Sequence, residues 1–328
     1  MRTVSARSDS FPLVAPFRIS RGVKTAADVI TVEIAADGLV GRGEGVPYPR
    51  YGETIGDALA AIEAVRPALE AGAGRAEIGT LLPPSAARNA VDCALWDLEA
   101  KLAGTSVTAL LGRAPVGPTP TALTVSLDTP DAMAAAAGKL ADVPLIKVKV
   151  DRTDPAAQIR AVRGAAPTPK LIVDPNESWG IAELRELQSL LVDLRVDLLE
   201  QPLPADDDAA LEGFRSAVPI AADEAAHVAG DLDALMAKYQ VINIKLDKTG
   251  GLTAALELAD AARAKGMGLM TGCMVCSSLA IAPALIIAAD SAFADLDGPV
   301  WLSADRPGGV SCDNGILMPA SATLWGGA

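Results

Sequence analysis

Polar side chains follow several short apolar runs in the second part of the chain, each at the point where a run ends. These residues are Lys147 and Lys149 in LIKVKV, Asp174 in IVDPN, Glu200 in LLEQP, Asp223 in IAADE, Lys245 in INIKLDKTGG, and Asp295 and Asp297 in FADLDGP. If the runs are parallel strands of a barrel, their carboxyl ends meet at one face, where catalytic groups gather. We therefore treat these residues as one candidate site.

Three of these residues are carboxylates that end consecutive runs: Asp174, Glu200 and Asp223. Like charges brought together repel unless they are protonated or neutralised by a cation. Carboxylate oxygens are hard ligands that suit Mg²⁺, which keeps other coordination positions for water or substrate. One such residue alone is better explained as a helix N-cap, but three in succession with flanking lysines predict one Mg²⁺ site.

The lysines have a complementary arrangement. Lys147 and Lys149 are two residues apart, so both point into the barrel, and Lys245 ends a run four strands further on. A cationic neighbour and a metal are expected to lower a lysine pKa from about 10.4 to roughly 7–8, which suits a general base. With Lys147 in support, one of Lys149 and Lys245 could remove a proton from one face of a carbon, and the other could return a proton to the opposite face. This reaction is a 1,1-proton transfer.

The metal would complete this chemistry. A proton next to a carboxylate is very weakly acidic, and a divalent cation on the carboxylate oxygens stabilises the enediolate that forms. We prefer Lys245 to Lys248 as the base, because Lys245 directly follows its apolar run and Lys248 is expected in a loop.

The apolar runs predict a (β/α) barrel. They are Ala122–Val125, Leu145–Val150, Leu171–Val173, Leu198–Leu199, Pro219–Ala222, Val241–Ile244, Gly268–Met270 and Phe293–Ala294. Alanine-rich helical stretches separate them, as parallel strands with crossover helices require. No G-x-G-x-x-G follows the first run, which argues against a dinucleotide-binding doubly wound sheet.

The first third of the chain has a different pattern. Asp37-Gly38 predicts a hairpin turn after the alternating stretch TVEIAA, and residues 53–70 and 84–103 have helical spacing. We expect an α+β domain over residues 1–115 and the barrel over 116–299. The tail, 300–328, lacks the barrel rhythm and is expected to return to the first domain.

Composition excludes several classes of protein. The 328 residues include 28 Lys and Arg against 41 Asp and Glu, a net charge of −13, so nucleic acid is not an expected partner. His227 is the single histidine, which excludes a multi-histidine zinc site. No apolar run suggests a membrane span or a signal core, and we expect a cytoplasmic protein whose Cys273 and Cys276 are buried thiols rather than a metal or redox pair.

With these motifs in order, the chain resembles the enolase superfamily, in particular its muconate-lactonising subgroup. The matching stretches are KVK at 147–149, VDPN, EQP, ADE and NIKLDKTGG. The resemblance extends over the whole chain and implies an enolase-like α/β fold, with an α+β N-terminal capping domain and a modified (β/α)₇β TIM-type barrel. Bases of Lys or His type with Mg²⁺ are a general feature of that superfamily.

Within the subgroup, the sequence looks like a dipeptide epimerase of the L-Ala-D/L-Glu type, because Asp295-Leu296-Asp297 matches the D-x-D motif of that family. The resemblance implies that Asp295 and Asp297 bind the free α-amino group. It also points to a capping loop at 18–24, where Arg21 and Lys24 could pair with the distal carboxylate of a Glu residue. Further expected neighbours of the substrate, each with packing or capping as the alternative, are Ser126, Tyr48 and Tyr51, with Asn176 and Glu224 behind the metal ligands.

Two alternatives stay open at this point. o-Succinylbenzoate synthase and muconate cycloisomerase use the same metal triad and lysines, but their substrates carry no ammonium group for Asp295 and Asp297 to bind. A barrel recruited only to bind a ligand is the third hypothesis, and the retention of the lysines and carboxylates argues against it. The expected partner is a small dipeptide, and self-association into a homo-oligomer is left open.

Overall fold

The N-terminal part pairs a three-stranded antiparallel sheet with helices. The computed structural model describes residues 2–327, and the chain begins with β1 (Thr3–Ile19), β2 (Gly22–Ala36) and β3 (Leu39–Gly45). The predicted turn is confirmed, because Asp37 and Gly38, between β2 and β3, have left-handed φ angles of 52° and 80°. The long strand β1 was not predicted; it is an edge strand with a largely exposed face, so its apolar alternation is weak.

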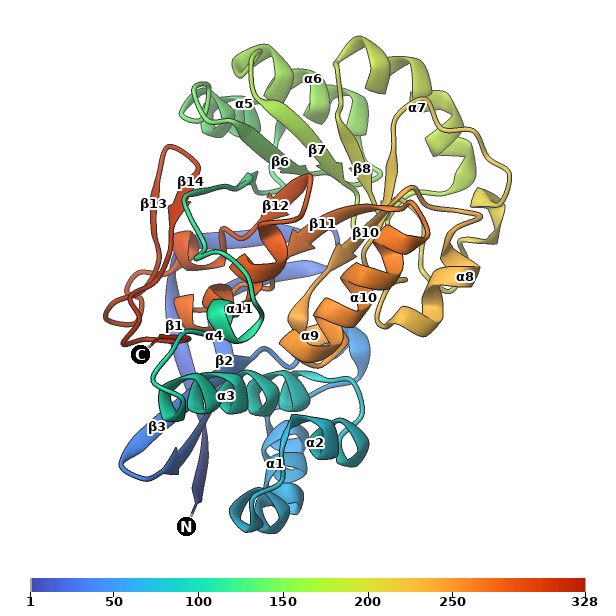
Figure 1. Ribbon diagram of the computed structural model, residues 1–328. Helices are drawn as coiled ribbons and strands as arrows, with labels where there is room; N and C mark the ends of the chain where they lie inside the picture. Colours follow the sequence, from blue (N-terminus) through green and yellow to red (C-terminus); the bar gives the residue numbers. More distant parts are fainter. Residues whose placement is uncertain (1, 328) are drawn as a thin grey trace.

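Helices cover one face of this sheet (Figure 1). They are α1 (Ile55–Ala71), α2 (Arg75–Leu81) and α3 (Ala86–Leu102), preceded by a 3₁₀ turn η1 (Pro49–Tyr51) and followed by α4 (Val107–Leu110). Alternate residues of β2, namely Ile30, Val32 and Ile34, pack with helix residues into a separate small core. Glycine at position 43 allows strand β3 to approach α3 closely, because a Cβ there would clash with the Ala90 carbonyl oxygen.

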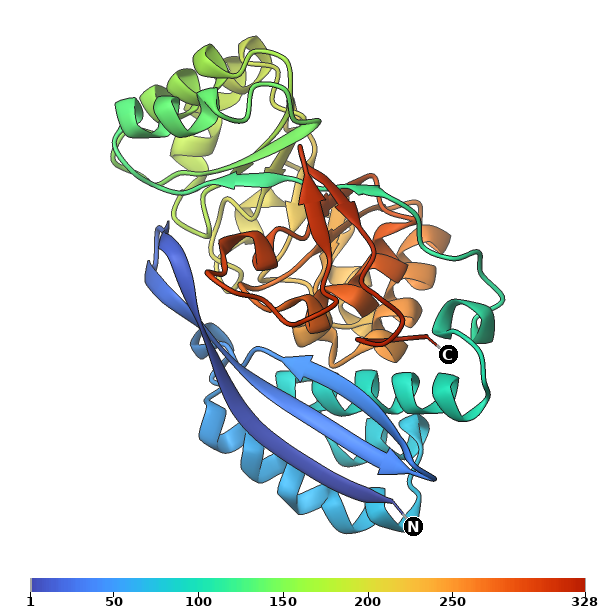
Figure 2. The ribbon, with the colours of Figure 1, turned by 90° about the vertical axis from the view of Figure 1, so that its left-hand side faces the viewer.

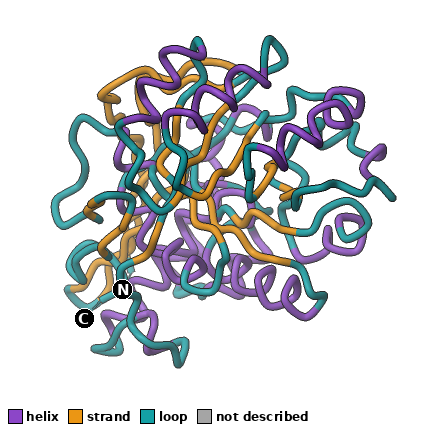
Figure 3. Tube along the Cα trace, turned by 90° about the horizontal axis from the view of Figure 1, so that it is seen from above, coloured by secondary structure: helices purple, strands orange, loops and turns teal. Residues whose placement is uncertain are grey.

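The second part is a parallel barrel, and all eight apolar runs are strands of it. In residues 2–327 one sheet holds β5 (Leu123–Val125), β6 (Leu145–Lys149), β7 (Lys170–Asp174), β8 (Leu198–Glu200), β9 (Ile220–Ala222), β10 (Val241–Ile244), β11 (Gly268–Gly272) and β12 (Phe293–Asp295). The Ala122 amide donates to the Ala294 carbonyl at 2.8 Å and so joins the two edge strands. Viewed from above, the strands lie inside a ring of helices (Figure 3).

The helices of this ring are unequal. They are α5 (Pro130–Gly138), α6 (Pro155–Ala165), α7 (Ile181–Asp193), α8 (Leu232–Leu235), α9 (Leu246–Thr249), α10 (Leu252–Ala264) and α11 (Ser278–Ala288), with 3₁₀ turns η2 (Ala209–Leu211), η3 (Ala229–Asp231) and η4 (Gly298–Trp301). Within the described chain, the crossover from β8 to β9 has only η2, because its sequence PLPADDD combines prolines with adjacent like charges.

An inner apolar layer closes the bottom of the barrel. Its buried members, with Phe293 packed against them, come one from each strand or strand approach: Ala122, Leu145, Ile172, Leu198, Ala221, Val241 and Met270. Because side chains alternate along a strand, the next inward positions lie two residues further on, nearer the carboxyl ends. Those positions include Lys147, Asp174, Glu200 and Asp223, so the barrel presents its polar groups at the opposite end from this layer.

The two parts of the chain are tied together by buried polar contacts. Figure 2 shows the β1–β2 hairpin rising from the capping sheet along the barrel. Asp247 in α9 accepts from the Val46 amide at 2.9 Å, and Glu44 in β3 accepts from the Ser277 amide at 2.8 Å. Arg306 also pairs with Glu44 at 2.8 Å.

The tail contacts both parts. Strands β13 (Ser311–Asp313) and β14 (Ile316–Met318) form a small sheet with β4 (Thr119–Pro120). Further on, the Trp325 indole donates to the Cys93 carbonyl of α3 at 3.0 Å. The boundaries at residues 115 and 300 stay predictions. Among residues 2–327, no helix is long and apolar enough to cross a membrane.

Candidate active site

A cavity of about 450 Å³ lies at the carboxyl ends of the barrel strands, under the capping domain. From the barrel it is lined by Lys147, Lys149, Asp223, Lys245, Asp295 and Asp297. The hairpin tip contributes Ile19, Arg21, Val23 and Lys24 to the other side, and the loop after β3 contributes Tyr48, Arg50 and Tyr51. The structure therefore brings six of the predicted strand-end residues to one cavity, while Asp174 and Glu200 are buried and are not among its lining residues.

Lys147 lies at the centre of the buried charges. Its ammonium is 2.6 Å from Asp295 Oδ2, 2.7 Å from Glu200 Oε2 and 3.1 Å from Asp174 Oδ2. Burial alone would lower the pKa of Lys147, but Asp295, Glu200 and Asp174 outweigh it and raise the pKa well above its usual range. With three carboxylates at ion-pair distance, Lys147 is a cation that organises the buried carboxylates.

Lys149 pairs with the carboxylate on the next strand. Its Nζ is 2.6 Å from Asp174 Oδ2. Burial opposes ionisation of Asp174, but Lys149 and Lys147 together lower the pKa of this carboxyl to about 2. Asn176 adds support, since its backbone amide donates to Asp174 Oδ1 at 2.8 Å and its side-chain amide donates to Oδ2 at 3.2 Å.

Two lysines share Asp223. Lys245 Nζ is 2.7 Å from Oδ2, and Lys248 Nζ is 2.8 Å from Oδ1. Burial would lower the pKa of Lys245, but the attraction of Asp223 outweighs it and the pKa is raised. The prediction that neighbouring charges lower this pKa is wrong for this arrangement. Lys248 is also not in a loop: it lies in the one-turn helix α9, fully buried.

Glu200 is the least compensated of the three carboxylates. Asn243 donates to Oε1 at 2.9 Å, while Oε2 lies 2.7 Å from the Lys147 ammonium and has no hydrogen-bond partner among residues 2–327. Burial first, and repulsion from Asp174 second, raise its pKa to about 8. In the part of the chain that the structure describes, no three Asp, Glu, His or Cys side chains converge at metal-binding distance. Lysine ammonium groups lie between the carboxylates instead.

Asp295 and Asp297 form an acidic pair at the end of β12, in addition to the carboxylates at the ends of β7, β8 and β9. Asp297 Oδ2 accepts from the Thr124 amide at 2.8 Å and from the Trp301 indole at 3.2 Å. Burial first, and the charge of Asp295 second, raise the pKa of Asp297 to about 6. Asp295 Oδ1 is buried without a hydrogen-bond partner. This pair has acceptor capacity left for a cation.

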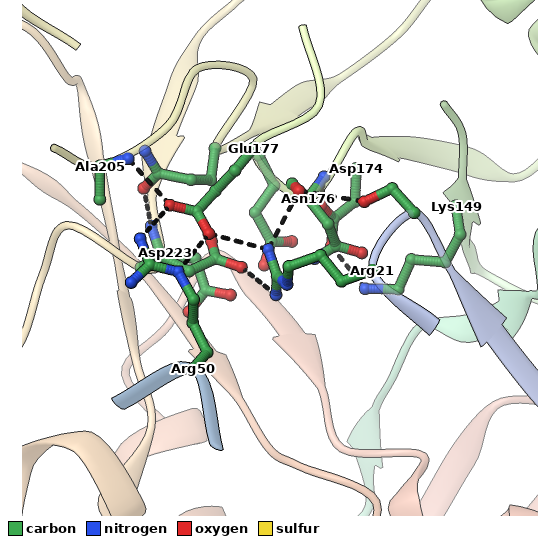
Figure 4. Close-up of polar contacts among 12 residues, drawn as sticks. Arg21, Arg50, Lys149, Asp174, Asn176, Glu177, Ala205 and Asp223 are labelled. Carbon is green, nitrogen blue, oxygen red and sulfur yellow. Dashed lines mark hydrogen bonds and ion pairs between the residues drawn. The ribbon is translucent and has the colours of Figure 1, made fainter. Parts of the chain in front are cut away.

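The predicted capping loop is the tip of the β1–β2 hairpin. Arg21 is fully engaged there, with its guanidinium 2.6 Å from Glu224 Oε1 and 2.9 Å from Glu177 Oε2 (Figure 4). Lys24 lines the cavity, and its Nζ lies 4.9 Å from the centre of the Tyr48 ring. Lys24 is thus the hairpin cation that remains available to a ligand.

Two other predicted neighbours, Ser126 and Tyr51, have defined places. Ser126 is not among the residues that line the cavity; its hydroxyl accepts from the Arg18 amide at 2.6 Å and donates to the Arg18 carbonyl at 3.0 Å. Ser126 therefore fastens the hairpin to the end of β5 and does not line the cavity. Tyr51 lines the cavity and packs edge-on against His227 at 5.0 Å.

Sequence reasoning missed several residues of the site. Arg50 and Glu177 pair at 2.7 Å across the cavity mouth. Gln201 accepts from the backbone amides of Asp223 and Ala225 at 2.9 and 3.1 Å and so shapes the loop after β9. For Glu177 and Gln201 the available signal was their position shortly after the strand-end residues, in DPNE and LLEQP.

Gly272 gives a test of this packing. A Cβ at this position would lie 2.7 Å from Asn243 Oδ1 and 2.9 Å from Lys245 Cε. We expect Gly272→Ala to displace Lys245 and to lower kcat about 100-fold, because a misplacement of about 1 Å has that effect. Steady-state kinetics would measure it. Gly164→Ala in α6 is the control, since nothing lies within 4 Å of its Cβ; equal activity of both variants would contradict the prediction.

Comparisons with known proteins agree with this geometry. Residues 1–112 match the family described as mandelate racemase / muconate lactonizing enzyme, N-terminal domain, and residues 131–314 match the enolase C-terminal domain-like family. L-Ala-D/L-Glu epimerase of Escherichia coli K12 is 50% identical over 93% of this chain and 96% of its own length. N-acetyl-D-glutamate racemase of a Pseudoalteromonas species is 43% identical over 92% of this chain and 96% of its own.

Solved structures extend the likeness. An enolase family member from Agrobacterium tumefaciens with homology to dipeptide epimerases, holding sodium, L-Ala-L-Glu and an ordered loop, has a TM-score of 0.97 at 46% identity, covering 99% of this chain and 100% of that one. A dipeptide epimerase from Enterococcus faecalis, complexed with Mg and L-Leu-L-Tyr, has a TM-score of 0.91 at 30% identity, covering 99% of both chains. This chain therefore belongs to the enolase superfamily and, within it, to the dipeptide epimerases, which are isomerases.

Proposed function

We propose that this protein is a Mg²⁺-dependent epimerase of dipeptides that interconverts L-Ala-L-Glu and L-Ala-D-Glu. The observation that carries the proposal is one cavity that is lined by Lys149 and Lys245 together with the acidic pair Asp295 and Asp297. Lys149 is on β6 and Lys245 follows β10, four strands away in an eight-stranded barrel. Two lysines suit proton transfer at one carbon, and an acidic pair suits a free amino group.

The metal would be held by Asp174, Glu200 and Asp223. They end three adjacent strands, all three are buried, and their donors are oxygens only, which is the set that Mg²⁺ prefers. The hydrogen-bond vacancy at Glu200 Oε2 and the raised pKa of Glu200 indicate excess negative charge that a cation would relieve. When bound, Mg²⁺ supplies a Lewis acid for the negative charge that develops on the substrate carboxylate.

The lysines would carry the proton. In the forward direction the neutral amine of one lysine takes the α-proton of the Glu residue, and the ammonium of the other returns a proton to the opposite face. Lys147 remains protonated throughout and offsets the carboxylates around it, in keeping with its raised pKa. An ion pair with Asp174 holds Lys149 in position, and an ion pair with Asp223 holds Lys245, until a substrate replaces those contacts.

The two ends of the dipeptide would be recognised separately. The α-ammonium group fits between Asp295 and Asp297, whose acceptor capacity is not used up. For the distal carboxylate we propose Lys24 rather than Arg21, because both ends of the Arg21 guanidinium are paired with Glu177 and Glu224. Tyr48 and Tyr51 would cover the apolar stem of the substrate.

Proton NMR of L-Ala-L-Glu with the protein and Mg²⁺ in D₂O tests this function. We expect the Glu α-proton signal to disappear while signals of the L,D diastereomer grow. No change in either signal would overturn the L-Ala-Glu assignment, and a library of dipeptides would then identify the substrate. Turnover of an o-succinylbenzoate precursor or of a muconate, with every dipeptide inert, would favour the synthase or cycloisomerase alternatives.

Metal removal has an expected outcome of its own. Treatment with EDTA should abolish epimerisation, and Mg²⁺ should restore it. Mg²⁺ should also raise the melting temperature, because a ligand that binds only the folded state stabilises it by about 2.7 kcal/mol at 100 times its Kd. Calorimetry checks this without any substrate. Glu200→Gln should lose the thermal response to Mg²⁺, and a full response in that variant would contradict the ligand assignment.

We further propose that the protein works in the cytoplasm. The four cysteines, Cys93, Cys273, Cys276 and Cys312, are all free thiols, which suits a reducing compartment. Cys276 is buried and Cys273 lies at the cavity wall. Size-exclusion chromatography with light scattering would decide whether the chain forms a homo-oligomer.

A further inference from the structure

The carboxylate of Glu177 joins its own loop, which follows β7, to three other segments of the chain near the cavity (Figure 4). It accepts from Arg21 in the hairpin tip at 2.9 Å and from the Ala205 amide in the β8–β9 loop at 2.8 Å. Arg50 of η1 approaches it side-on, with Nε and Nη2 at 2.8 and 2.7 Å from its two oxygens. The Glu177 side chain is only 7% exposed, yet Glu177 is not among the residues that line the cavity.

The backbone around Glu177 is unusual in a way that serves these contacts. Asn176 and Glu177 have φ angles of 45° and 66°, a left-handed region that residues other than glycine adopt uncommonly. The carbonyl of Asn176 accepts from Ser20 Oγ at 3.1 Å and from Arg21 Nη1 at 3.0 Å. Strained conformations of this kind persist where the surrounding contacts enforce them, commonly at functional sites. Two consecutive residues of the loop after β7 thus contact the hairpin, Asn176 through its carbonyl and Glu177 through its carboxylate.

The same loop is connected to the charged centre. Asn176, which receives the hairpin on its carbonyl, donates from its own amide to Asp174 Oδ1 at 2.8 Å. On the other side, Arg21 also binds Glu224, which directly follows Asp223. The hairpin therefore contacts Asn176 and Glu224, which lie two residues after Asp174 and one residue after Asp223 in the chain.

We propose that Glu177 is a positioning residue that holds the hairpin closed over the active site, by bridging Arg21 and Arg50 without touching the substrate. The hairpin brings Ile19, Val23 and Lys24 to the cavity wall. Closure of such a cover excludes water and commits the substrate to reaction. Glu177 thereby controls how tightly the dipeptide is held, while Lys149 and Lys245 remain in place on the barrel.

The test compares Glu177→Gln with wild type, both with Mg²⁺. Glutamine keeps the size of the side chain but loses the charge that strengthens its bonds to two arginines. We expect KM for the dipeptide to rise about tenfold, because the bonds from Glu177 to both arginines lose their charge assistance. We expect kcat to stay within about threefold, because the proton-transfer groups are unchanged. Amide hydrogen exchange of residues 17–24 should become faster.

Glu63→Gln is the matched control. Glu63 pairs with Arg66 at 2.6 Å on the exposed face of α1, so the variant loses a glutamate–arginine pair in the capping domain, away from the cavity. Its KM and hairpin exchange should equal those of wild type. If Glu177→Gln fails to fold, Arg50→Gln removes the same bridge from the side of η1 and should speed hairpin exchange in the same way.

This inference uses the proposed epimerase activity only for its kinetic half. Hairpin exchange is measured without substrate, so faster exchange in Glu177→Gln supports the closure role even if the wild type epimerises no dipeptide. Unchanged exchange together with unchanged KM, in a protein that does epimerise, would overturn the role of Glu177 and leave the function standing. A fall in kcat with unchanged KM and unchanged exchange would also overturn it.

Discussion

Replacing either Lys149 or Lys245 by alanine should abolish epimerisation and lower kcat at least about 1000-fold, since positioned acid–base groups contribute effects of that order. Lys149 ends β6 and Lys245 directly follows β10, so in the proposed mechanism each lysine serves one face of the substrate carbon. Each single variant should still exchange the α-proton of one diastereomer with D₂O, with retention of configuration. Proton NMR on separate L-Ala-L-Glu and L-Ala-D-Glu samples measures this.

Lys170→Ala provides the control for the loss of a lysine. Lys170 starts β7 at the exposed, opposite end of the barrel, so its removal should leave activity unchanged. Circular dichroism and Mg²⁺-dependent melting would establish that the site variants are folded. Full epimerisation by both site variants would contradict the two-lysine mechanism. Loss of exchange from both diastereomers in one variant would contradict the assignment of one lysine to each face.

Asp297→Asn should lower kcat/KM for the dipeptide about 100-fold or more, chiefly through KM, because truncating one partner of a buried charged pair costs 2–5 kcal/mol. Burial and Asp295 raise the pKa of Asp297 to about 6, so part of this carboxyl is protonated in mildly acidic solution. A substrate ammonium binds its ionised form. For wild type, KM should therefore increase as the pH falls through about 6, whereas KM of the variant should lack this dependence.

An N-acetylated substrate separates binding of the ammonium from other effects. N-acetyl-L-glutamate has no ammonium group, so any weak turnover of it should be no lower in Asp297→Asn than in wild type. Asp313→Asn, on the exposed strand β13, controls for the loss of one negative charge. An equal loss of activity toward both substrates would show that Asp297 acts on the fold of the site rather than on the amino group.

The sequence by itself determined the barrel and the end of it that carries the chemistry. Leu145 and Lys147 on β6, Ile172 and Asp174 on β7, and Leu198 and Glu200 on β8 repeat one pattern: an apolar inward residue followed two positions later by a charged one. Such a pattern is readable because side-chain alternation is a local property of a strand, and because parallel strands all place their carboxyl ends at one face.

The tertiary structure alone decided which charges meet and what their pKa values are. Lys147 pairs with Asp295, 148 positions away, and Arg21 pairs with Glu177, 156 positions away, so no local pattern links them. Of the two hairpin cations predicted to meet the substrate, Arg21 is paired with Glu177 and Glu224, which leaves Lys24 as the proposed partner. The pKa of Lys245 is raised, not lowered, because Asp223 lies 2.7 Å from its Nζ and outweighs both burial and the repulsion of Lys147. Charge interactions depend on distance and burial in space, and only the folded chain fixes both.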